Sequence, residues 1–156
     1  MQALLLQPNQ VPHVWNEVAP LITKAVAHAE EDVDADDFLR PIINGQVFLW
    51  IVTDESGLVS VCFGSFDEYP RQKSFHIYGW ATKSGRQFDE VMDTFNDSVV
   101  NFAKINGCDF IEAKVRKGLA KKLKWNDNHS LVTLTLNNNG RKSQNNSPHG
   151  ETRESI

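Results

Sequence analysis

Four polar side chains near the middle of the chain could act as general bases. His76 and Tyr78 stand two residues apart in the run SFHIYGWA. In a strand, where side chains alternate between the two faces, they would share one face. Either could take a proton from a reacting group directly or through water, as could Glu68, or its neighbour Asp67, at the end of the preceding apolar run. The simpler interpretation stays open: a partly buried, hydrogen-bonded His and Tyr, and two acids that only belong to a turn.

The segment WATKSGRQFDE leads from this strand into a helical pattern. Ser84 and Gln87 have the spacing of a capping box, which makes Ser84 the expected N-cap. Backbone N–H groups at a helix N-terminus bind anions, and Gly85 would let a ligand approach the backbone closely. Lys83 and Arg86 add positive charge, so the pattern suits a pyrophosphate. The alternative, that the box only caps the helix and the cations are solvated, stays open.

The cysteines and the acidic residues give no familiar metal or redox motif. Cys62 and Cys108 are far apart in apolar surroundings, without CxxC or zinc spacing, which predicts inert buried thiols in a reducing compartment. An EF-hand loop starting at Asp32 would need Gly and Glu at its sixth and twelfth positions, and neither is present. No metal site is therefore predicted. The acidic run 30–37 is interpreted as a solvated loop or as a face for a cationic partner.

Charge is distributed unevenly along the 156 residues, a length typical of one domain. Residues 1–70 hold 11 acids and 2 bases, whereas 71–156 hold 9 acids and 14 bases. The basic second half suits an anionic ligand. Six bases within 114–124 could meet a phosphate or lie on a solvated helix face, but the net charge of -4 and the lack of interleaved aromatics argue against nucleic acid as a partner. We find no signal peptide and no membrane-spanning apolar run.

Apolar periodicity predicts the order β-α-α-β-β-β-α-β-α-β. The expected strands are 1–7, 46–54, 58–66, 74–81, 108–115 and 130–136, and the expected helices are 14–29, a short one capped by Asp34 or Asp36 and closed by Pro41 and Gly45, 85–106 and 116–127. Three strands joined by short turns, followed by a crossover helix into another strand, predict an α+β fold. Its mixed central sheet would carry helices on both faces.

Two further expectations concern the second half of the chain. In strand 108–115, Ile111 and Ala113 should face the core, and Glu112 and Lys114 the solvent. Residues 1–136 should form a single domain. Residues 137–156 have no aromatic side chain and one aliphatic, so they are predicted to be a disordered polar tail.

The order of elements and three stretches of sequence resemble the GNAT superfamily of N-acetyltransferases, and more narrowly the small, divergent GNAT-like proteins encoded by bacteriophages. The stretches are YPRQKSFHIYGWATKSGRQF, FAKINGCDFIEAKV and RKGLAKKLKW, within a resemblance that covers residues 1–136. It implies that the strand–turn–helix unit binds the pantetheine and pyrophosphate of acetyl-CoA. The pantetheine would lie beside Ile77, Tyr78, Gly79 and Trp80, and the pyrophosphate would be held by Lys83, Ser84, Gly85 and Arg86.

The sequence departs from the family pattern in two places. The family loop is typically R/Q-x-x-G-x-G/A, and centring it on Gly85 puts Thr82 and Gln87 at its outer positions, so only the central glycine is kept. The Tyr proposed in the family to protonate the leaving thiolate has no counterpart, and Trp125 lies there instead.

Two functions therefore stay open for a GNAT-like chain. One is acetyl-CoA-dependent transfer of acetyl to an amine, with an acceptor such as a host protein and with His76, Tyr78 or Glu68 as the base. The other is a non-catalytic GNAT-fold module, a virion component or host-takeover factor that acts by protein contact. Either would work in the cytoplasm of a bacterial host or with the virion. An unrelated α+β binding domain is the third interpretation.

Overall fold

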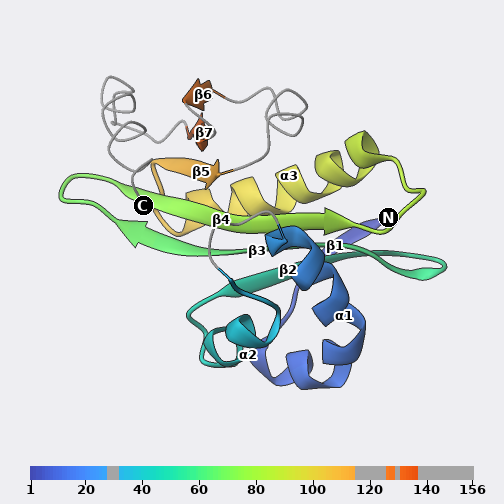
Figure 1. Cartoon of the computed structure of the whole chain (residues 1–156). Helices are drawn as coiled ribbons and strands as arrows, with labels where there is room; N and C mark the ends of the chain where they lie inside the picture. The colour runs from blue at the N-terminus through green and yellow to red at the C-terminus, as the bar shows by residue number, and fades with distance from the viewer. Residues whose placement is uncertain (28–31, 115–125, 129–130, 137–156) are drawn as a thin grey trace. The chain divides into compact units, whose positions relative to one another are not determined.

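The computed structural model describes residues 1–27, 32–114, 126–128 and 131–136. Its elements are β1 (Gln2–Leu5), the 3-10 turn η1 (Pro8–Gln10), α1 (Val11–Val26), α2 (Asp36–Ile43), β2 (Phe48–Asp54), β3 (Gly57–Glu68), β4 (Lys73–Thr82), α3 (Phe88–Ile105), β5 (Phe110–Lys114), β6 (Asn126–Asn128) and β7 (Leu131–Thr135), shown in Figure 1. The strands form one sheet in the order β1-β2-β3-β4-β5-β7-β6. The predicted basic helix 116–127 lies largely outside the described residues, but its expected end is wrong, because Asn126–Asn128 form a strand.

The sheet is mixed. The pairs β1–β2, β2–β3, β5–β7 and β6–β7 are antiparallel, whereas β4 and β5 are parallel. A parallel neighbour requires a crossover connection, and α3 provides it. The predicted α+β class, with a mixed sheet and helices on both faces, is confirmed. Among the described residues, the helices are too short or too polar to cross a membrane.

The contacts divide the chain into two compact units. The first consists of Met1–Ser65 and Tyr78–Ser98, and the second contains Phe66–Ile77 and the described residues from Val99 onward. The strands β3 and β4 and the helix α3 each contribute one part to each unit.

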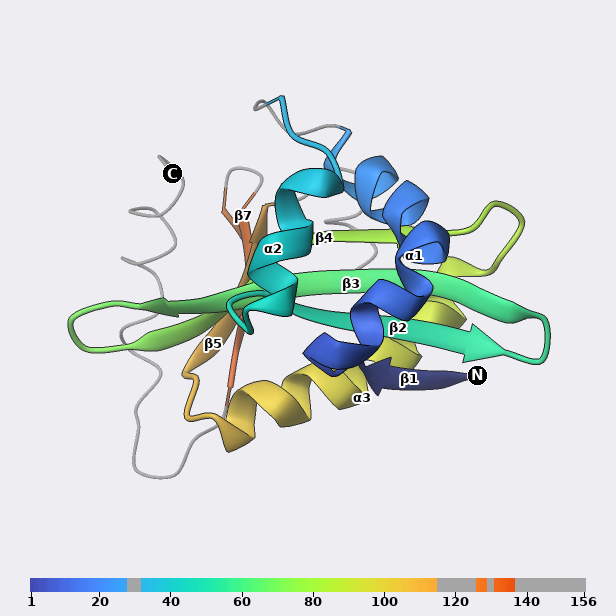
Figure 2. The same ribbon diagram turned by 90° about the horizontal axis from the view of Figure 1, so that it is seen from below.

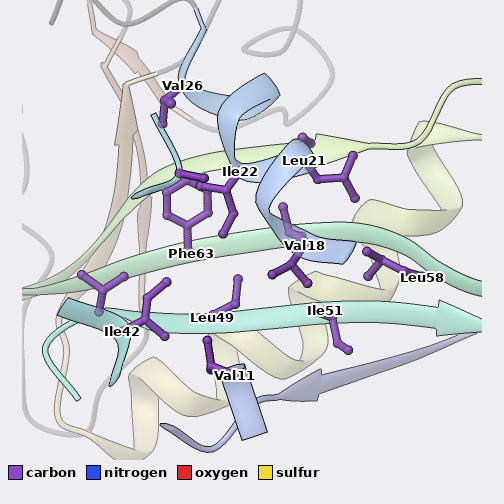
Figure 3. Packing of buried hydrophobic residues seen from close by; sticks show 14 residues of the cluster. Val11, Val18, Leu21, Ile22, Val26, Ile42, Leu49, Ile51, Leu58 and Phe63 are labelled. Carbon is purple, nitrogen blue, oxygen red and sulfur yellow. The ribbon is translucent and has the colours of Figure 1, made fainter. Parts of the chain in front are cut away.

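In the first unit, α1 and α2 pack on one face of β1–β3, and α3 passes on the other face (Figures 1 and 2). Figure 3 shows the apolar stripe of α1 against β2 and β3. Its buried members are Val11, Val18, Leu21, Ile22 and Val26, which meet Leu49, Ile51, Val61 and Phe63. Burying one such side chain contributes about 1.5–3 kcal/mol, so this cluster fixes how α1 lies on the sheet.

The two N-terminal helices have different ends from those predicted. Helix α1 begins at Val11, one turn before the predicted Val14, because a proline in the first turn is compatible with helical backbone. The N-cap of α2 is Ala35, so the predicted cap by Asp34 or Asp36 is wrong, although the Asp34 carboxylate accepts from Asp36 N at 2.9 Å just before the helix. Pro41 lies inside α2 and does not close it; the chain turns at Gly45 with φ of 75°.

In the second unit, Asp109, just before β5, forms hydrogen bonds with Lys73 at the start of β4 and with Leu136 just after β7. Asp109 N donates to Lys73 O at 2.7 Å, and Lys73 N donates back to Asp109 Oδ2 at 2.9 Å. Leu136 N donates to Asp109 O at 2.8 Å. The ring of Phe66 lies 5.5 Å from that of Phe75 and stacks on Phe102 of α3 at 5.6 Å. These contacts fix the register that places Ser74–Ile77 beside Phe110–Ala113.

Candidate functional site

Tyr78 lies in the part of β4 that belongs to the first unit. Its side chain is 39% exposed, and its hydroxyl is 2.6 Å from Ser65 Oγ on β3. The ring centroid lies 5.8 Å from Phe38 of α2 and 6.5 Å from Phe63. The ring is therefore supported from α2 and β3, while the residue as a whole remains exposed. The roles predicted for Tyr78, as a base and as a residue beside the pantetheine, stay predictions.

The neighbours of Tyr78 are placed less openly than expected. Ile77 is 1% exposed, so a ligand could reach only its backbone. At Gly79, an added Cβ would lie 2.9 Å from the Cβ of Ala25 and 3.2 Å from a ring carbon of Phe63. The missing side chain of Gly79 thus allows α1 to approach the sheet, which is a packing role. Trp80 is partly buried.

The turn after β4 differs from the predicted capped helix. Helix α3 begins at Phe88, not at Gly85, so Ser84 is not its N-cap. Gly85 has φ of +82°, a left-handed conformation that cannot continue into a right-handed helix. An added Cβ on Gly85 would have nothing within 4 Å, and Lys83 and Ser84 are exposed. The backbone here is open to a ligand, but as a turn and not as the first turn of a helix.

Acidic residues offset part of the positive charge at this turn. The Arg86 guanidinium forms a hydrogen-bonded ion pair with the Asp54 carboxylate at the end of β2. The first turn of α3 carries Asp89 and Glu90, which suit the helix dipole but repel an anion. Lys83 is the exposed cation of the predicted set, and its backbone N donates to Val59 O at 2.9 Å.

A second polar group of residues lies in the second unit and centres on Glu112 of β5. Glu112 is fully buried, although the sequence predicted that it faces solvent. That prediction is wrong because both faces of β5 are covered at these positions: Ile111, Glu112 and Ala113, which alternate between the faces, are all 0% exposed. Alternation marks a solvent face only where one side of the sheet is open.

Hydroxyl groups from two other strand ends satisfy one oxygen of Glu112. The Tyr69 hydroxyl donates to Oε2 at 2.6 Å, and Ser74 Oγ donates to the same atom at 2.5 Å. Burial by itself raises the pKa of Glu112, but contacts with His76, Ser74 and Tyr69 outweigh it and hold the pKa below its ordinary value. Glu112 is thus a buried carboxylate kept in its charged form.

His76 faces this carboxylate and Asp67. His76 Nδ1 lies 3.9 Å from Glu112 Oε1 and 3.9 Å from Asp67 Oδ2. The side chains of His76 and Asp67 are 22% and 30% exposed. Of the two acidic candidate bases, Asp67 and Glu68, it is Asp67 that lies close to His76. Glu68 is exposed at the end of β3. The arrangement can hold a proton or a cation between an imidazole and two carboxylates.

Sequence reasoning missed Glu112, and one signal could have found it. It is the acidic residue in the otherwise apolar run FIEA, within a strand that follows a crossover helix. Such strands are commonly central and covered on both faces, so an acid there must have buried partners.

No protein-family model and no curated protein matches the sequence. Several solved structures share its fold. Aminoglycoside 6'-acetyltransferase type Ii has a TM-score of 0.66 at 12% identity, over 88% of this chain and 99% of that one. A predicted acetyltransferase with acetyl-CoA from Clostridium acetobutylicum has a TM-score of 0.61 at 15% identity, over 86% and 96%. Ribosomal-protein-alanine N-acetyltransferase from Brucella melitensis biovar Abortus 2308 has a TM-score of 0.59 at 12% identity, over 80% and 87%.

These similarities cover most of each chain and concern the fold. They agree with the mixed sheet, the parallel pair β4–β5 and the crossover helix described above. The chain has the GNAT acetyltransferase fold.

Proposed function

We propose that the protein binds acetyl-CoA and transfers the acetyl group to an amine. The observation that carries the proposal is the fold, which this chain shares with acetyltransferases. One of these was solved with acetyl-CoA. The open turn at Gly85 and the accessible Tyr78 support it. Fold alone does not establish an activity.

The residues of the turn fit a pyrophosphate in part. Lys83 and the backbone of Ser84 and Gly85 are exposed, and they would hold the anionic groups of the coenzyme. Arg86 would contribute its charge only after exchanging the Asp54 carboxylate for phosphate oxygens.

The proposed reaction needs positioning and one proton acceptor. The amine nitrogen attacks the thioester carbonyl carbon, a C–N bond forms and the C–S bond breaks. The proton lost by the amine goes to a base, and the departing thiolate takes up a proton to give the free thiol of CoA. His76 is our first candidate for the base, because its partly exposed imidazole has Nδ1 3.9 Å from a carboxylate oxygen of Glu112 and 3.9 Å from one of Asp67. Tyr78 is the second. Trp125, at the place of the family's proton donor, lies outside the described residues.

Calorimetric titration with CoA and acetyl-CoA tests binding. Gly85→Trp should abolish it by blocking the open backbone at the turn. Gly45→Trp is the matched control, because Gly45 also has a positive φ and nothing within 4 Å of an added Cβ. It carries the same backbone strain in a different turn and should bind normally. Lack of binding by the wild-type protein at millimolar coenzyme would rule out the transferase; unchanged binding by Gly85→Trp would place the coenzyme elsewhere.

The second candidate function is a GNAT-fold module that acts by protein contact and transfers nothing. The Arg86–Asp54 ion pair and the two acids that open α3 favour it, since both oppose a pyrophosphate at the turn. Incubation with radiolabelled acetyl-CoA and a bacterial lysate separates the two: label on a protein or small amine supports transfer, and coenzyme binding without label supports the module.

The finer biological setting is also a proposal. The resemblance to small proteins encoded by bacteriophages supports a role in the cytoplasm of an infected bacterium or in the virion, with a host or virion protein as acceptor or partner. Identification of the labelled proteins in the same lysate experiment tests it; label restricted to small metabolites would count against a protein acceptor.

A further inference from the structure

Three strands of the second unit bring together one imidazole and two carboxylates. Asp67 lies near the end of β3, His76 in β4 and Glu112 in β5. Each offers one ligand atom, and these three atoms lie within 4.8 Å of one another. His76 and Glu112 are register partners in the parallel pair, so the backbone holds two of the three groups side by side.

Glu112 provides an independent sign that this cluster takes a ligand. Its Oε2 accepts from Tyr69 and Ser74, which fixes the orientation of the carboxylate. Its Oε1 is buried and receives no hydrogen bond from the described residues. The residue is 0% exposed, so no bulk water compensates this oxygen. A buried carboxylate oxygen without a donor is costly unless a cation meets it.

We propose that Asp67, His76 and Glu112 bind a divalent first-row transition-metal ion, with Zn²⁺ and Mn²⁺ as the representative probes. Imidazole nitrogen with two carboxylates suits this class, whereas Ca²⁺ and Mg²⁺ prefer oxygen ligands alone. The two carboxylates also balance the charge of a dication.

The spacing of the groups fits such an ion. Metal–ligand bonds of about 2.0–2.2 Å allow two ligand atoms to lie at most about 4.4 Å apart. The distances from His76 Nδ1 to both carboxylates, 3.9 Å, are within this bound. The pair Asp67–Glu112, within 4.8 Å, needs a side-chain shift of under about 1 Å.

The partial exposure of two of the three groups and the hydrogen bonds to the third resemble features of metal sites in which water or a substrate completes the coordination. Asp67 and His76 are 30% and 22% exposed, which leaves one side of the cluster open. Tyr69 and Ser74 act as outer partners that orient the ligand Glu112, as hydrogen-bond partners of metal ligands commonly do. This inference does not depend on acetyl transfer.

Titration of the tag-free, chelator-treated full-length protein with ZnCl₂ and with MnCl₂ tests the proposal. We expect one Zn²⁺ per chain, and weaker binding of Mn²⁺. Asp67→Asn, His76→Ala and Glu112→Gln should each raise the Kd at least about tenfold, the smallest effect expected even for loss of an outer partner of a metal ligand. His13→Ala is the matched control, because His13 is exposed on α1, and it should leave the Kd unchanged.

A second measurement does not depend on the variants folding equally well. X-ray absorption of the Zn²⁺ complex should show one imidazole and otherwise oxygen ligands. The proposal is overturned if Zn²⁺ does not bind, if a sulfur ligand appears, or if the two variants of partly exposed residues, Asp67→Asn and His76→Ala, bind Zn²⁺ as tightly as the wild type.

Discussion

Glu112 on β5 and His76 on β4 are register partners, and Glu112 Oε1 lies 3.9 Å from His76 Nδ1. The carboxylate has no exposed surface, so the hydroxyls of Tyr69 and Ser74 replace the water at its Oε2. Removing the Glu112 side chain takes an acceptor away from the Tyr69 and Ser74 hydroxyls.

We therefore predict that Glu112→Ala lowers the free energy of unfolding by about 3 kcal/mol or more, because Tyr69 and Ser74 lose their acceptor. Glu112→Gln keeps an acceptor oxygen of the same shape and should cost only about 1 kcal/mol. Urea unfolding in the presence of a chelator measures both. Equal losses for the two variants would show that the hydroxyl contacts contribute little.

The close contact at Gly79 gives a prediction about packing. Gly79→Ala should lower the free energy of unfolding by about 1–3 kcal/mol, because its Cβ would overlap that of Ala25. Ala25→Gly makes room at a helix-propensity cost of about 1 kcal/mol. The double variant should be more stable than the sum of the two single effects indicates. Strict additivity in urea unfolding would mean that α1 shifts freely and that the contact is not a constraint.

The ion pair at the turn gives a prediction about coenzyme affinity. Asp54→Asn keeps the oxygen that accepts from Ser56 but removes the charge that holds Arg86. We expect CoA to bind up to about fivefold more tightly, the range available to a partly exposed ion pair.

Calorimetry on two further variants isolates the cause of this gain. Arg86→Gln should bind CoA more weakly than the wild type, and adding Asp54→Asn to it should restore nothing. A gain from Asp54→Asn that persists without Arg86 would show that the effect is one of general charge and not of freeing this guanidinium.

Both cysteines should be unreactive in the folded protein. Burial raises the pKa of Cys62 well above its ordinary value and the pKa of Cys108 to about 11. At pH 8 the thiolate fraction of Cys108 is then about one in a thousand, so alkylation by iodoacetamide should be slow. Mass spectrometry should find both thiols modified in urea and neither in buffer. Rapid native alkylation of either would contradict the buried placement.

Ionisation of the same thiols should lower the free energy of unfolding at alkaline pH. A thiol in the unfolded chain ionises near its ordinary pKa, about 8.5, whereas the folded chain keeps Cys108 neutral until about pH 11. The thiols' contribution to the free energy of unfolding is complete below their pKa in the unfolded chain. It is lost as the pH rises toward their pKa in the folded chain. A Cys62→Ala/Cys108→Ala variant should lose less unfolding free energy than the wild type between pH 8 and 10; an equal loss would assign the alkaline effect to other groups.

Most of the fold could be predicted from the sequence because local patterns dominate it. The apolar runs of β2, β3 and β4 are separated by short turns, and α1 and α3 have a clear helical period. The wrong prediction of where α3 begins has a local cause. Ser84 and Gln87 match a capping box, but the left-handed backbone of Gly85 between them ends any helical path. The spacing of Ser84 and Gln87 shows that they could form a capping box, but the φ angle of Gly85 decides whether the box forms.

The group around Glu112 could not be predicted, since it depends on register across a crossover. His76 was recognised as a candidate base, but its partner lies on the far side of α3, 36 positions later in the chain. A shift of one residue in the β4–β5 pairing would turn Glu112 to the opposite face. The hydrogen bonds of Asp109 with Lys73 set that register, and no sequence period reports them.

The absence of a side chain at Gly79 also constrains how this sequence can diverge. A methyl group at position 79 fits only if position 25 on α1 gives up its own, so the two sites should covary among relatives that keep this helix placement. Glycine at 79 should accompany alanine at 25, and a larger residue at 79 should appear only with glycine there. An alignment of relatives would thus show the contact between α1 and β4 as a correlated pair, separate from any signal left by a ligand.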